Sequence, residues 1–348
     1  VRMNMSDTTA ALTIGEPLAV IRAATGAFAG LIVRNGNQIQ SLNADLGGAT
    51  NLFTVDPASF VSAGNVFGSA LPGLWIFVDG RTVYGVNLAT PANRAPLATL
   101  ATGETLVSHP VGDGTSGYFA INAAATGRVL RVTGALAPSD VTTLDAPAQY
   151  LAVTSSRVVA SLASTPVRIV SAPKTGGTMQ AVHTASVGET ALTLLTSGEN
   201  VYLSKLAIGI GALGSSTVIV RSDGTNAQTL ANTRVMHGIS PTVVSVSQGG
   251  LSQSYAIVLA DGVSAIGDFA GATVRAVEGA TRNTLLTYGT FPATPSGTVF
   301  FMSAAPLQYG QTGLMSFFGM SSNSASDLYF MKSNTAGLQR VTTFVTAM

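Results

Sequence analysis

Three histidines, His109, His183 and His237, are the side chains of this sequence best suited to proton transfer or metal binding near neutral pH. Three imidazoles can bind a zinc ion, and one imidazole beside a serine and a carboxylate can act as a general base. The sequence contains no His-Glu-x-x-His, calcium-loop, Walker or Gly-x-Ser-x-Gly motif. We therefore expect no metal and no cofactor, with His109 and His237 as the candidate ligands if one is bound.

The carboxylates fall mostly at turns. Asp79, Asp223 and Asp261 each precede a glycine, where a turn conformation and a side-chain bond to the backbone account for them. Asp113 and Glu199 fall in loops expected to join first and second strands of a repeat, where a carboxylate pair could do glycosidase chemistry. The glycine-rich segment 112–117 follows no parallel strand and opens no helix, which favours a flexible inter-strand loop over a phosphate site. We assign no catalytic residue.

The composition excludes several classes of protein. Charged residues make up 9% of the 348 residues, whereas a typical soluble domain has roughly 25%. Apolar residues make up 46%, so the chain can bury a large core and is not intrinsically disordered. A net charge of +1 gives no basic patch for nucleic acid. There is no cysteine, and the most hydrophobic stretch, 201–220, is interrupted by Lys205 and by glycines, so we expect neither disulfides nor a transmembrane helix.

Helix signals are nearly absent, and strand signals are abundant. Gly30–Arg34 and Asn37–Leu42 flank Asn35-Gly36, and Trp75–Val78 and Arg81–Val86 flank an Asp-Gly pair. Asn-Gly and Asp-Gly between apolar runs predict β-hairpins with type I′ turns, because both central residues of such a turn need positive φ.

The hairpin recurs seven times along the chain. Its second strand recurs about every 48 residues, which is typical of four-stranded propeller blades. The positions that mark this strand are Ile39, Val83, Val129, Val167, Val218, Val274 and Leu328. A fourth apolar run follows each marker, and another run, such as 149–153 or 191–195, usually precedes the hairpin. The sequence therefore predicts an all-β fold, a seven-bladed β-propeller of four-stranded antiparallel blades over residues 18–348. Residues 1–17 are expected to form an N-terminal extension or a closing strand.

The segment Val218–Leu230 shows the repeat most clearly, as strand, Asp-Gly turn and a polar run that ends in Thr-Leu. This pattern resembles the secreted and periplasmic bacterial propellers of the TolB and YncE-like kind. The resemblance implies a propeller fold and a habit of binding partners in a bacterial envelope, and it brings no catalytic residue. A single tryptophan and the lack of recurring Gly-Gly pairs argue against WD and kelch repeats.

The last repeat is rich in aromatic residues and methionine. Most of these side chains are expected in the core, and the alternative is an adaptable hydrophobic surface for a partner. The residues of this candidate surface are Phe300, Phe301, Met315, Phe317, Phe318 and Met320.

Taken together, these features favour a non-enzymatic propeller that serves as an interaction or structural module, periplasmic or extracellular, in a bacterial envelope or surface assembly. Its expected partners are proteins or polysaccharide. The alternatives are a polysaccharide-active propeller enzyme, a lyase or glycosidase, and a carbohydrate-binding propeller. A cluster of titratable residues at one mouth of the channel would favour an enzyme, and a mouth lined by Ser, Thr and Ala would favour the module. The sequence names no ligand, partner or assembly state.

Overall fold

The computed structural model describes residues 2–4, 7–12, 15–23, 27–66, 71, 73–107, 109–209, 212–231, 233–238, 244–246, 251–253, 257–261, 273–278, 283–290, 299–307, 314–321, 325–332 and 339–345. Side chains are described within 15–230, apart from those of residue 197 and residues 208–215. The chain divides into two compact units, one of residues 1–153 with 172–179 and the other of residues 154–171 with 180–348.

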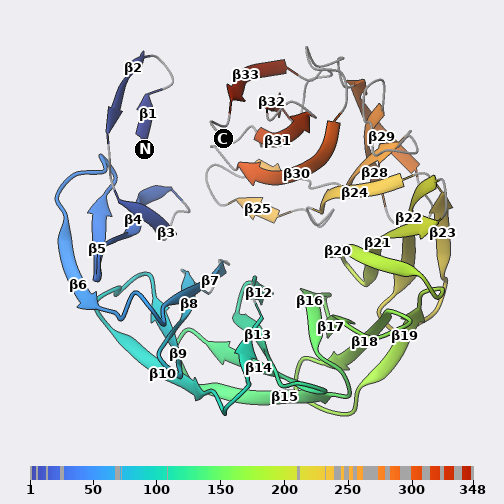
Figure 1. The fold of residues 1–348 in the computed structure, drawn as a ribbon, viewed down its shortest axis with the longest axis horizontal. Helices are drawn as coiled ribbons and strands as arrows, with labels where there is room; N and C mark the ends of the chain where they lie inside the picture. The colour runs from blue at the N-terminus through green and yellow to red at the C-terminus, as the bar shows by residue number, and fades with distance from the viewer. Residues whose placement is uncertain are drawn as a thin grey trace. The chain divides into compact units, whose positions relative to one another are not determined.

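Seven sheets follow one another along the chain, each running through its strands in sequence order (Figure 1). The first three are β3 (Glu16–Arg22), β4 (Phe28–Asn35), β5 (Gln38–Asn43) and β6 (Thr50–Thr54); β7 (Val61–Val66), β8 (Leu74–Asp79), β9 (Thr82–Asn87) and β10 (Arg94–Thr99); and β11 (Thr105–Leu106), β12 (Val111–Gly112), β13 (Ser116–Asn122), β14 (Gly127–Thr133) and β15 (Pro138–Leu144). In the third sheet both β11 and β12 pair with β13.

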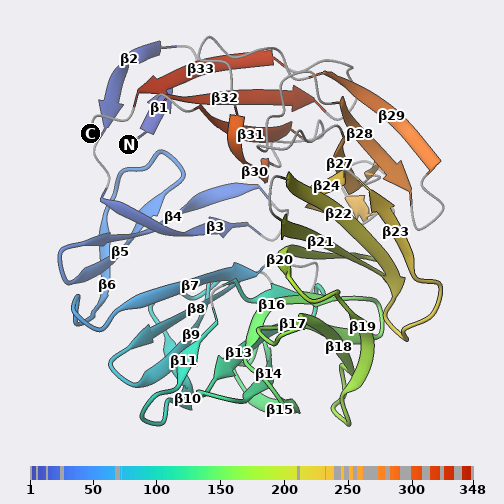
Figure 2. The same cartoon turned by 45° about the vertical axis from the view of Figure 1, so that its right-hand side comes forward.

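The later sheets repeat this order, as Figure 2 shows from a second direction. They are β16 (Ala148–Val153), β17 (Arg157–Leu162), β18 (Arg168–Pro173) and β19 (Gln180–Thr184); β20 (Glu189–Ser197), β21 (Asn200–Gly209), β22 (Ala212–Arg221) and β23 (Gln228–Ala231); β24 (Thr233–Gly238), β27 (Ile257–Asp261), β28 (Thr273–Glu278) and β29 (Asn283–Thr290); and β30 (Val299–Leu307), β31 (Leu314–Ser321), β32 (Ala325–Lys332) and β33 (Gln339–Val345). Two small sheets pair β1 (Arg2–Asn4) with β2 (Asp7–Leu12), and β25 (Val244–Val246) with β26 (Leu251–Gln253).

The predicted four-stranded antiparallel repeat is confirmed. Each predicted hairpin forms the second and third strands of one sheet, and the runs at 149–153 and 191–195 lie in the first strands β16 and β20. Within the first unit, the first strands of neighbouring sheets contact one another, β3 with β7 and β12 with β7 and β16. The described residues form no helix, and hence none that could cross a membrane. The role of residues 1–17 as a closing strand stays a prediction.

The tight hairpin turns differ from the prediction in register. Asn35 pairs with Gln38, so the central residues of the first turn are Gly36 and Asn37 rather than Asn35 and Gly36. Gly36 has a φ of 62°, whereas Asn37 is not among the residues with positive φ. The predicted type I′ turn is therefore wrong, because the pattern of one positive φ at the first central position is that of a type II′ turn. The second hairpin repeats this arrangement with Gly80 at the first central position.

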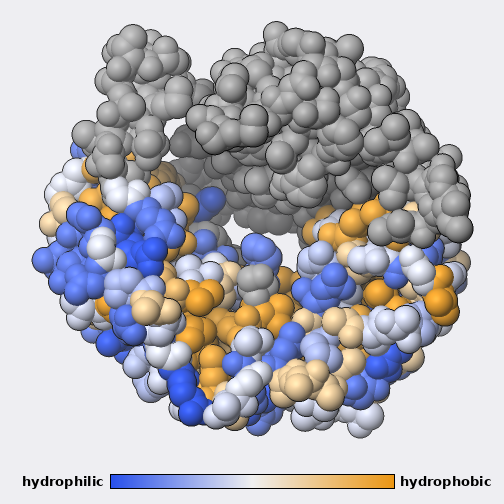
Figure 3. Space-filling model, in the orientation of Figure 1, coloured by the Kyte–Doolittle hydropathy of each residue, from blue (hydrophilic) through white to orange (hydrophobic). Residues whose placement is uncertain are grey.

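Middle strands are buried on both faces, which explains why they are continuously apolar in sequence. In β8 every residue before Asp79 is buried, and in β13 every residue before Asn122. Trp75 and Phe77 of β8 stack with ring centroids 4.4 Å apart and join a cluster with the first sheet. The other face of β8 packs with the third sheet through Ile76 and Phe119. Hydrophobic residues gather over the second and third sheets in Figure 3, and the first sheet is more hydrophilic.

The fourth strands lie at the outer edges of the sheets and are irregular. A register shift interrupts the pairing between third and fourth strands in six of the seven sheets that the structure describes. The exception is the pairing of β22 with β23, which is continuous over its four residue pairs. A bulge of this kind leaves an extra residue unpaired and bends the edge strand.

Candidate functional site

Asp113 and Glu199, the candidate acid pair, lie where the sequence predicts them. Asp113 follows β12 and precedes β13, and Glu199 is in the turn between β20 and β21. Both therefore belong to connections between the first and second strands of a sheet. Asp113 belongs to the first unit of the chain and Glu199 to the second.

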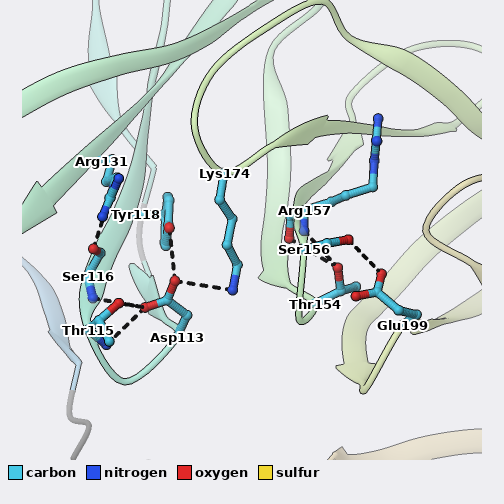
Figure 4. Close-up of polar contacts among 10 residues, drawn as sticks. All are labelled: Asp113, Thr115, Ser116, Tyr118, Arg131, Thr154, Ser156, Arg157, Lys174 and Glu199. Atoms are coloured by element: carbon cyan, nitrogen blue, oxygen red, sulfur yellow. Dashed lines mark hydrogen bonds and ion pairs between the residues drawn. The ribbon is translucent and has the colours of Figure 1, made fainter. Parts of the chain in front are cut away.

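Asp113 closes a tight turn and accepts hydrogen bonds on both carboxylate oxygens (Figure 4). Its Oδ1 accepts from the Thr115 N–H at 2.9 Å, the Thr115 hydroxyl at 2.8 Å and the Ser116 N–H at 2.9 Å. Its Oδ2 accepts from the Tyr118 hydroxyl at 3.0 Å and pairs with Lys174 Nζ at 3.1 Å. The glycine-rich segment is thus an inter-strand loop as predicted, and these bonds make it an ordered turn.

The environment of Asp113 fixes its charge. Burial of the carboxyl acts to raise its pKa, but the bonds from Thr115, Ser116 and Lys174 together hold that pKa well below its usual range. Burial, with the bond to Asp113 next, raises the pKa of Tyr118 to about 12. A general acid needs a pKa near the working pH, and a general base needs a free lone pair. The lowered pKa does not suit a general acid near neutral pH, and the contacts of Asp113 tie its turn to Tyr118 and Lys174.

Glu199 is held in a similar way within the second unit (Figure 4). Its Oε2 accepts from the hydroxyls of Ser156 at 3.0 Å and Ser222 at 2.5 Å. Burial acts to raise its pKa, but the bonds from Ser222, Ser156 and Thr154 leave that pKa below the usual value. Ser156 belongs to the turn before β17 and Ser222 to the turn after β22. The carboxylate therefore ties the fourth sheet to the fifth.

Arg157, the first residue of β17, extends this tie. Its Nε donates to the Ser171 hydroxyl at 2.8 Å, and its Nη2 donates to the Gln180 side chain at 3.1 Å. The Ser171 hydroxyl donates in turn to the Ser222 carbonyl at 2.7 Å, and the Gln180 amide donates to the Asp223 carbonyl at 3.1 Å. The guanidinium is committed to neighbouring protein groups rather than offered to an anionic ligand.

Two further carboxylates belong to a recurring Gly-Glu turn that was not predicted from the sequence. Gly103 has a φ of 82°, and Glu104 reaches back to accept from the Ala101 N–H at 2.7 Å while pairing with Arg128 at 3.2 Å. The sequence contains a pattern that indicates this turn, because four of the five glutamates follow a glycine and Gly-Glu-Thr occurs twice.

The second Gly-Glu-Thr turn leads into β20, whose first residue is Glu189. Gly188 has a φ of 88°, and Glu189 accepts from the Ser186 N–H at 2.7 Å and from Lys205 Nζ at 2.7 Å. Lys205 is 6% exposed, so this is a nearly buried ion pair. His183 of β19 lies near the pair, and its buried Nε2 has no hydrogen-bond partner. Burial, then the charge of Lys205, lowers the pKa of His183, while Glu189 acts to raise it.

The other histidines form no shared site within the described residues. His109 is exposed, with a φ of 70°, between β11 and β12. His237, the other candidate ligand, is in strand β24, and its side chain lies outside the described part. No group of three or more metal-binding side chains occurs among the residues that the structure describes.

The turn aspartates have different roles. Asp223 accepts from the Thr225 N–H at 3.0 Å and its hydroxyl at 2.6 Å, as expected for a turn. The prediction for Asp79 is incomplete, because its carboxylate accepts from the Asp56 N–H at 3.1 Å and pairs with Arg94 at 3.4 Å. Asp261 ends β27, and its side chain is outside the described part.

The candidate partner surface is placed only by its backbone. Its residues lie in β30 and β31, where Phe301 pairs with Met320 and Pro306 with Met315. The side chains of Phe300, Phe301, Met315, Phe317, Phe318 and Met320 lie outside the described part of the chain.

No family model and no curated protein matches the sequence. Among solved structures, an oligogalacturonate lyase from Vibrio parahaemolyticus, itself a propeller, matches with a TM-score of 0.50 and 12% identity, over 91% of this chain and 89% of that one. This chain has a β-propeller fold. A prolyl endopeptidase structure matches with a TM-score of 0.50 and 10% identity over 88% of this chain, which spans 46%, about half, of that protein. A WD40 domain of SCAP from fission yeast has a TM-score of 0.47 and 9% identity, over 83% of this chain and 74% of that one.

At such identities the likeness shows the propeller fold and nothing about activity. What the chain does must therefore be argued from its own side chains.

Proposed function

We propose that this chain is a non-enzymatic, seven-bladed β-propeller that serves as an interaction or structural module of a bacterial envelope or extracellular surface assembly. Seven successive sheets with the same strand order support seven blades. The resemblance of Val218–Leu230 to propellers of the TolB and YncE-like kind supports the bacterial envelope. Protein partners follow from that resemblance, and polysaccharide is the second class of ligand.

This proposal depends on four carboxylates whose oxygens are already bonded to protein groups. Asp113, Glu104, Glu189 and Glu199 each accept hydrogen bonds or ion pairs from protein groups. The pKa values of Asp113, Glu189 and Glu199 all lie below their usual values. A glycosidase needs one carboxyl group with a raised pKa, and a lyase needs a base that can accept a proton from substrate. These carboxylates are suited to holding strands and turns together.

An activity screen tests the absence of catalysis. Purified chain is incubated with polygalacturonate and neutral polysaccharides, and unsaturated products and new reducing ends are measured. We expect no product above that of a preparation purified from cells with an empty vector. Product formed by the wild type, and lost in Glu199→Gln or Asp113→Asn variants that remain folded by circular dichroism, would overturn the proposal in favour of a polysaccharide-active enzyme.

The lack of cysteine allows a direct test of location. Val187 is 80% exposed, so a Val187→Cys variant presents one accessible thiol, and Val218→Cys, at a fully buried position, is the matched control. The gene with its native flanking sequence is expressed in the source bacterium, and a membrane-impermeant maleimide is added. We expect the Val187→Cys variant to be labelled on intact cells or after the outer membrane is opened. Labelling only after complete lysis contradicts a periplasmic or extracellular location.

The same variants test for a partner. Labelling of Val187→Cys and of a Val61→Cys variant, at a position that is 58% exposed, is timed in the isolated chain and in gently solubilised envelopes. An interaction module predicts that at least one thiol reacts more slowly in the envelope sample than in the isolated chain. Equal rates at both positions, with the chain migrating as an isolated species in native electrophoresis, would contradict a stable assembly.

A further inference from the structure

The tip of the first hairpin carries the only Asn-Gly pair in the sequence, Asn35-Gly36. Asn35 ends strand β4, and its pairing with Gln38 is the last rung of the β4–β5 ladder. Both Asn35 and Gly36 are exposed. The pair therefore lies at a solvent-facing turn, in which the carbonyl of the next residue, Asn37, accepts from the Val55 N–H at 2.9 Å.

The local conformation leaves the peptide between these residues accessible. Gly36 has a φ of 62°, and an added Cβ there would meet nothing within 4 Å. Glycine has no side chain to shield its own nitrogen, and it keeps more backbone freedom than any other residue. Asn226-Ala227 is the natural comparison, because Asn226 is also exposed and has a φ of 55° but is followed by a residue with a side chain.

We propose that Asn35 is a site of spontaneous deamidation through a cyclic imide formed with Gly36. The Gly36 nitrogen loses its proton to base and attacks the Asn35 Cγ, forming a C–N bond. The Cγ–Nδ2 bond breaks, and the leaving nitrogen departs with a proton as ammonia. Water then opens the five-membered imide at either carbonyl. Opening at the Cγ carbonyl gives aspartate, and opening at the other gives isoaspartate, in which the chain continues through the former side chain.

The modification changes both charge and geometry. The chain has a formal net charge of +1, so one new carboxylate makes it formally neutral. Isoaspartate also adds a methylene to the backbone at the Asn35–Gln38 rung, next to Arg34, which pairs with Glu16 at 2.6 Å. The folded chain would therefore accumulate a more acidic form, altered at the tip of its first hairpin.

Incubation of the folded, full-length protein tests this proposal. The protein is kept in mildly alkaline buffer at physiological temperature and sampled over weeks. Conversion at Asn35 and Asn226 is followed by mass spectrometry, in which each event adds the mass difference between water and ammonia. Isoaspartate is distinguished from aspartate by electron-based fragmentation and by an isoaspartate-specific methyltransferase. Asn35→Gln is the control, since it keeps the amide but would require a larger ring.

We expect progressive loss of the intact Asn35 form, well ahead of Asn226, with isoaspartate among the products. The rate should rise with pH, because the Gly36 nitrogen must lose a proton. Asn35→Gln should remove the new acidic band on isoelectric focusing. Conversion at Asn35 no faster than at Asn226 overturns the proposal. So does conversion that occurs only after unfolding in urea, because the folded hairpin would then be what blocks the imide.

Discussion

Asp113→Asn should destabilise the first unit by an amount that follows from the contacts of each carboxylate oxygen. Asparagine can keep the oxygen that accepts from Thr115 and Ser116. Its amide nitrogen then takes the place of Oδ2, which accepts from the Tyr118 hydroxyl and pairs with Lys174. An amide nitrogen accepts no hydrogen bond, so the Tyr118 O–H loses its acceptor and Lys174 loses its ion pair.

The two losses differ in size. Tyr118 is 1% exposed, and a buried hydroxyl left without an acceptor costs about 1–3 kcal/mol. Lys174 can swing its ammonium into water, so its lost ion pair costs about 1 kcal/mol. The variant should therefore lose about 3 kcal/mol of unfolding free energy, and with a urea slope of about 2 kcal/mol/M its midpoint should fall by about 1.5 M.

Trp75 fluorescence can measure this loss of stability in the unit that contains Asp113. It is the only tryptophan, it is fully buried, and it belongs to the same unit as Asp113, so its emission reports unfolding there. The control is a double-mutant cycle with Tyr118→Phe, which removes the stranded hydroxyl and should recover about 1–2 kcal/mol in the Asp113→Asn background. A wild-type midpoint for Asp113→Asn, or equal costs of Tyr118→Phe in both backgrounds, refutes the reasoning.

Three further predictions concern other ties in the molecule. The pKa of His183 is lowered in the folded chain, so the unfolded chain binds a proton more readily. The free energy of unfolding should therefore fall as pH drops below 6.5, the ordinary pKa of histidine. Hydrogen exchange of the β19 amides should show this pH dependence, and His183→Leu should lack it. Glu189→Gln leaves the nearly buried ammonium of Lys205 without a counter-ion and should cost about 3 kcal/mol. Lys205→Met should cost less, because the Glu189 carboxylate it leaves is more exposed and still accepts from the Ser186 N–H; equal losses in thermal unfolding would contradict this. Gly103→Ala should cost about 1–2 kcal/mol because φ there is 82°, whereas Gly134→Ala, where φ is not positive, should leave the urea midpoint nearly unchanged.

The sequence predicted the strands well because each repeat places its signals close together along the chain. An apolar run, a glycine turn and a second apolar run lie within about a dozen residues, and local pattern is enough to identify them. The turn register was less accessible. Turns centred on Asn35-Gly36 and on Gly36-Asn37 differ by two residues in strand pairing, so each side chain keeps the same face and the apolar pattern does not distinguish them.

The candidate site shows what local pattern misses. Asp113 was identified correctly as a loop residue, but its partner Lys174 comes from the loop after β18, far along the chain. Asp79 likewise accepts from the N–H of Asp56, which follows β6 of the preceding sheet. Contacts between elements distant in sequence depend on how the sheets pack. The Gly-Glu turns are different, because their repetition is visible in the sequence and could have predicted a recurring turn.

The register shifts of the outer strands have a consequence for how the molecule behaves at high concentration. A regular exposed edge offers a continuous row of backbone donors and acceptors to a neighbouring molecule, and a bulge interrupts that row. With a net charge of +1, repulsion between copies is too weak to keep them dispersed. The interrupted edges take over that role, and the one continuous outer strand among the described sheets, β23, spans only four residues. We therefore expect the colloidal stability of this protein to depend on backbone geometry and little on ionic strength.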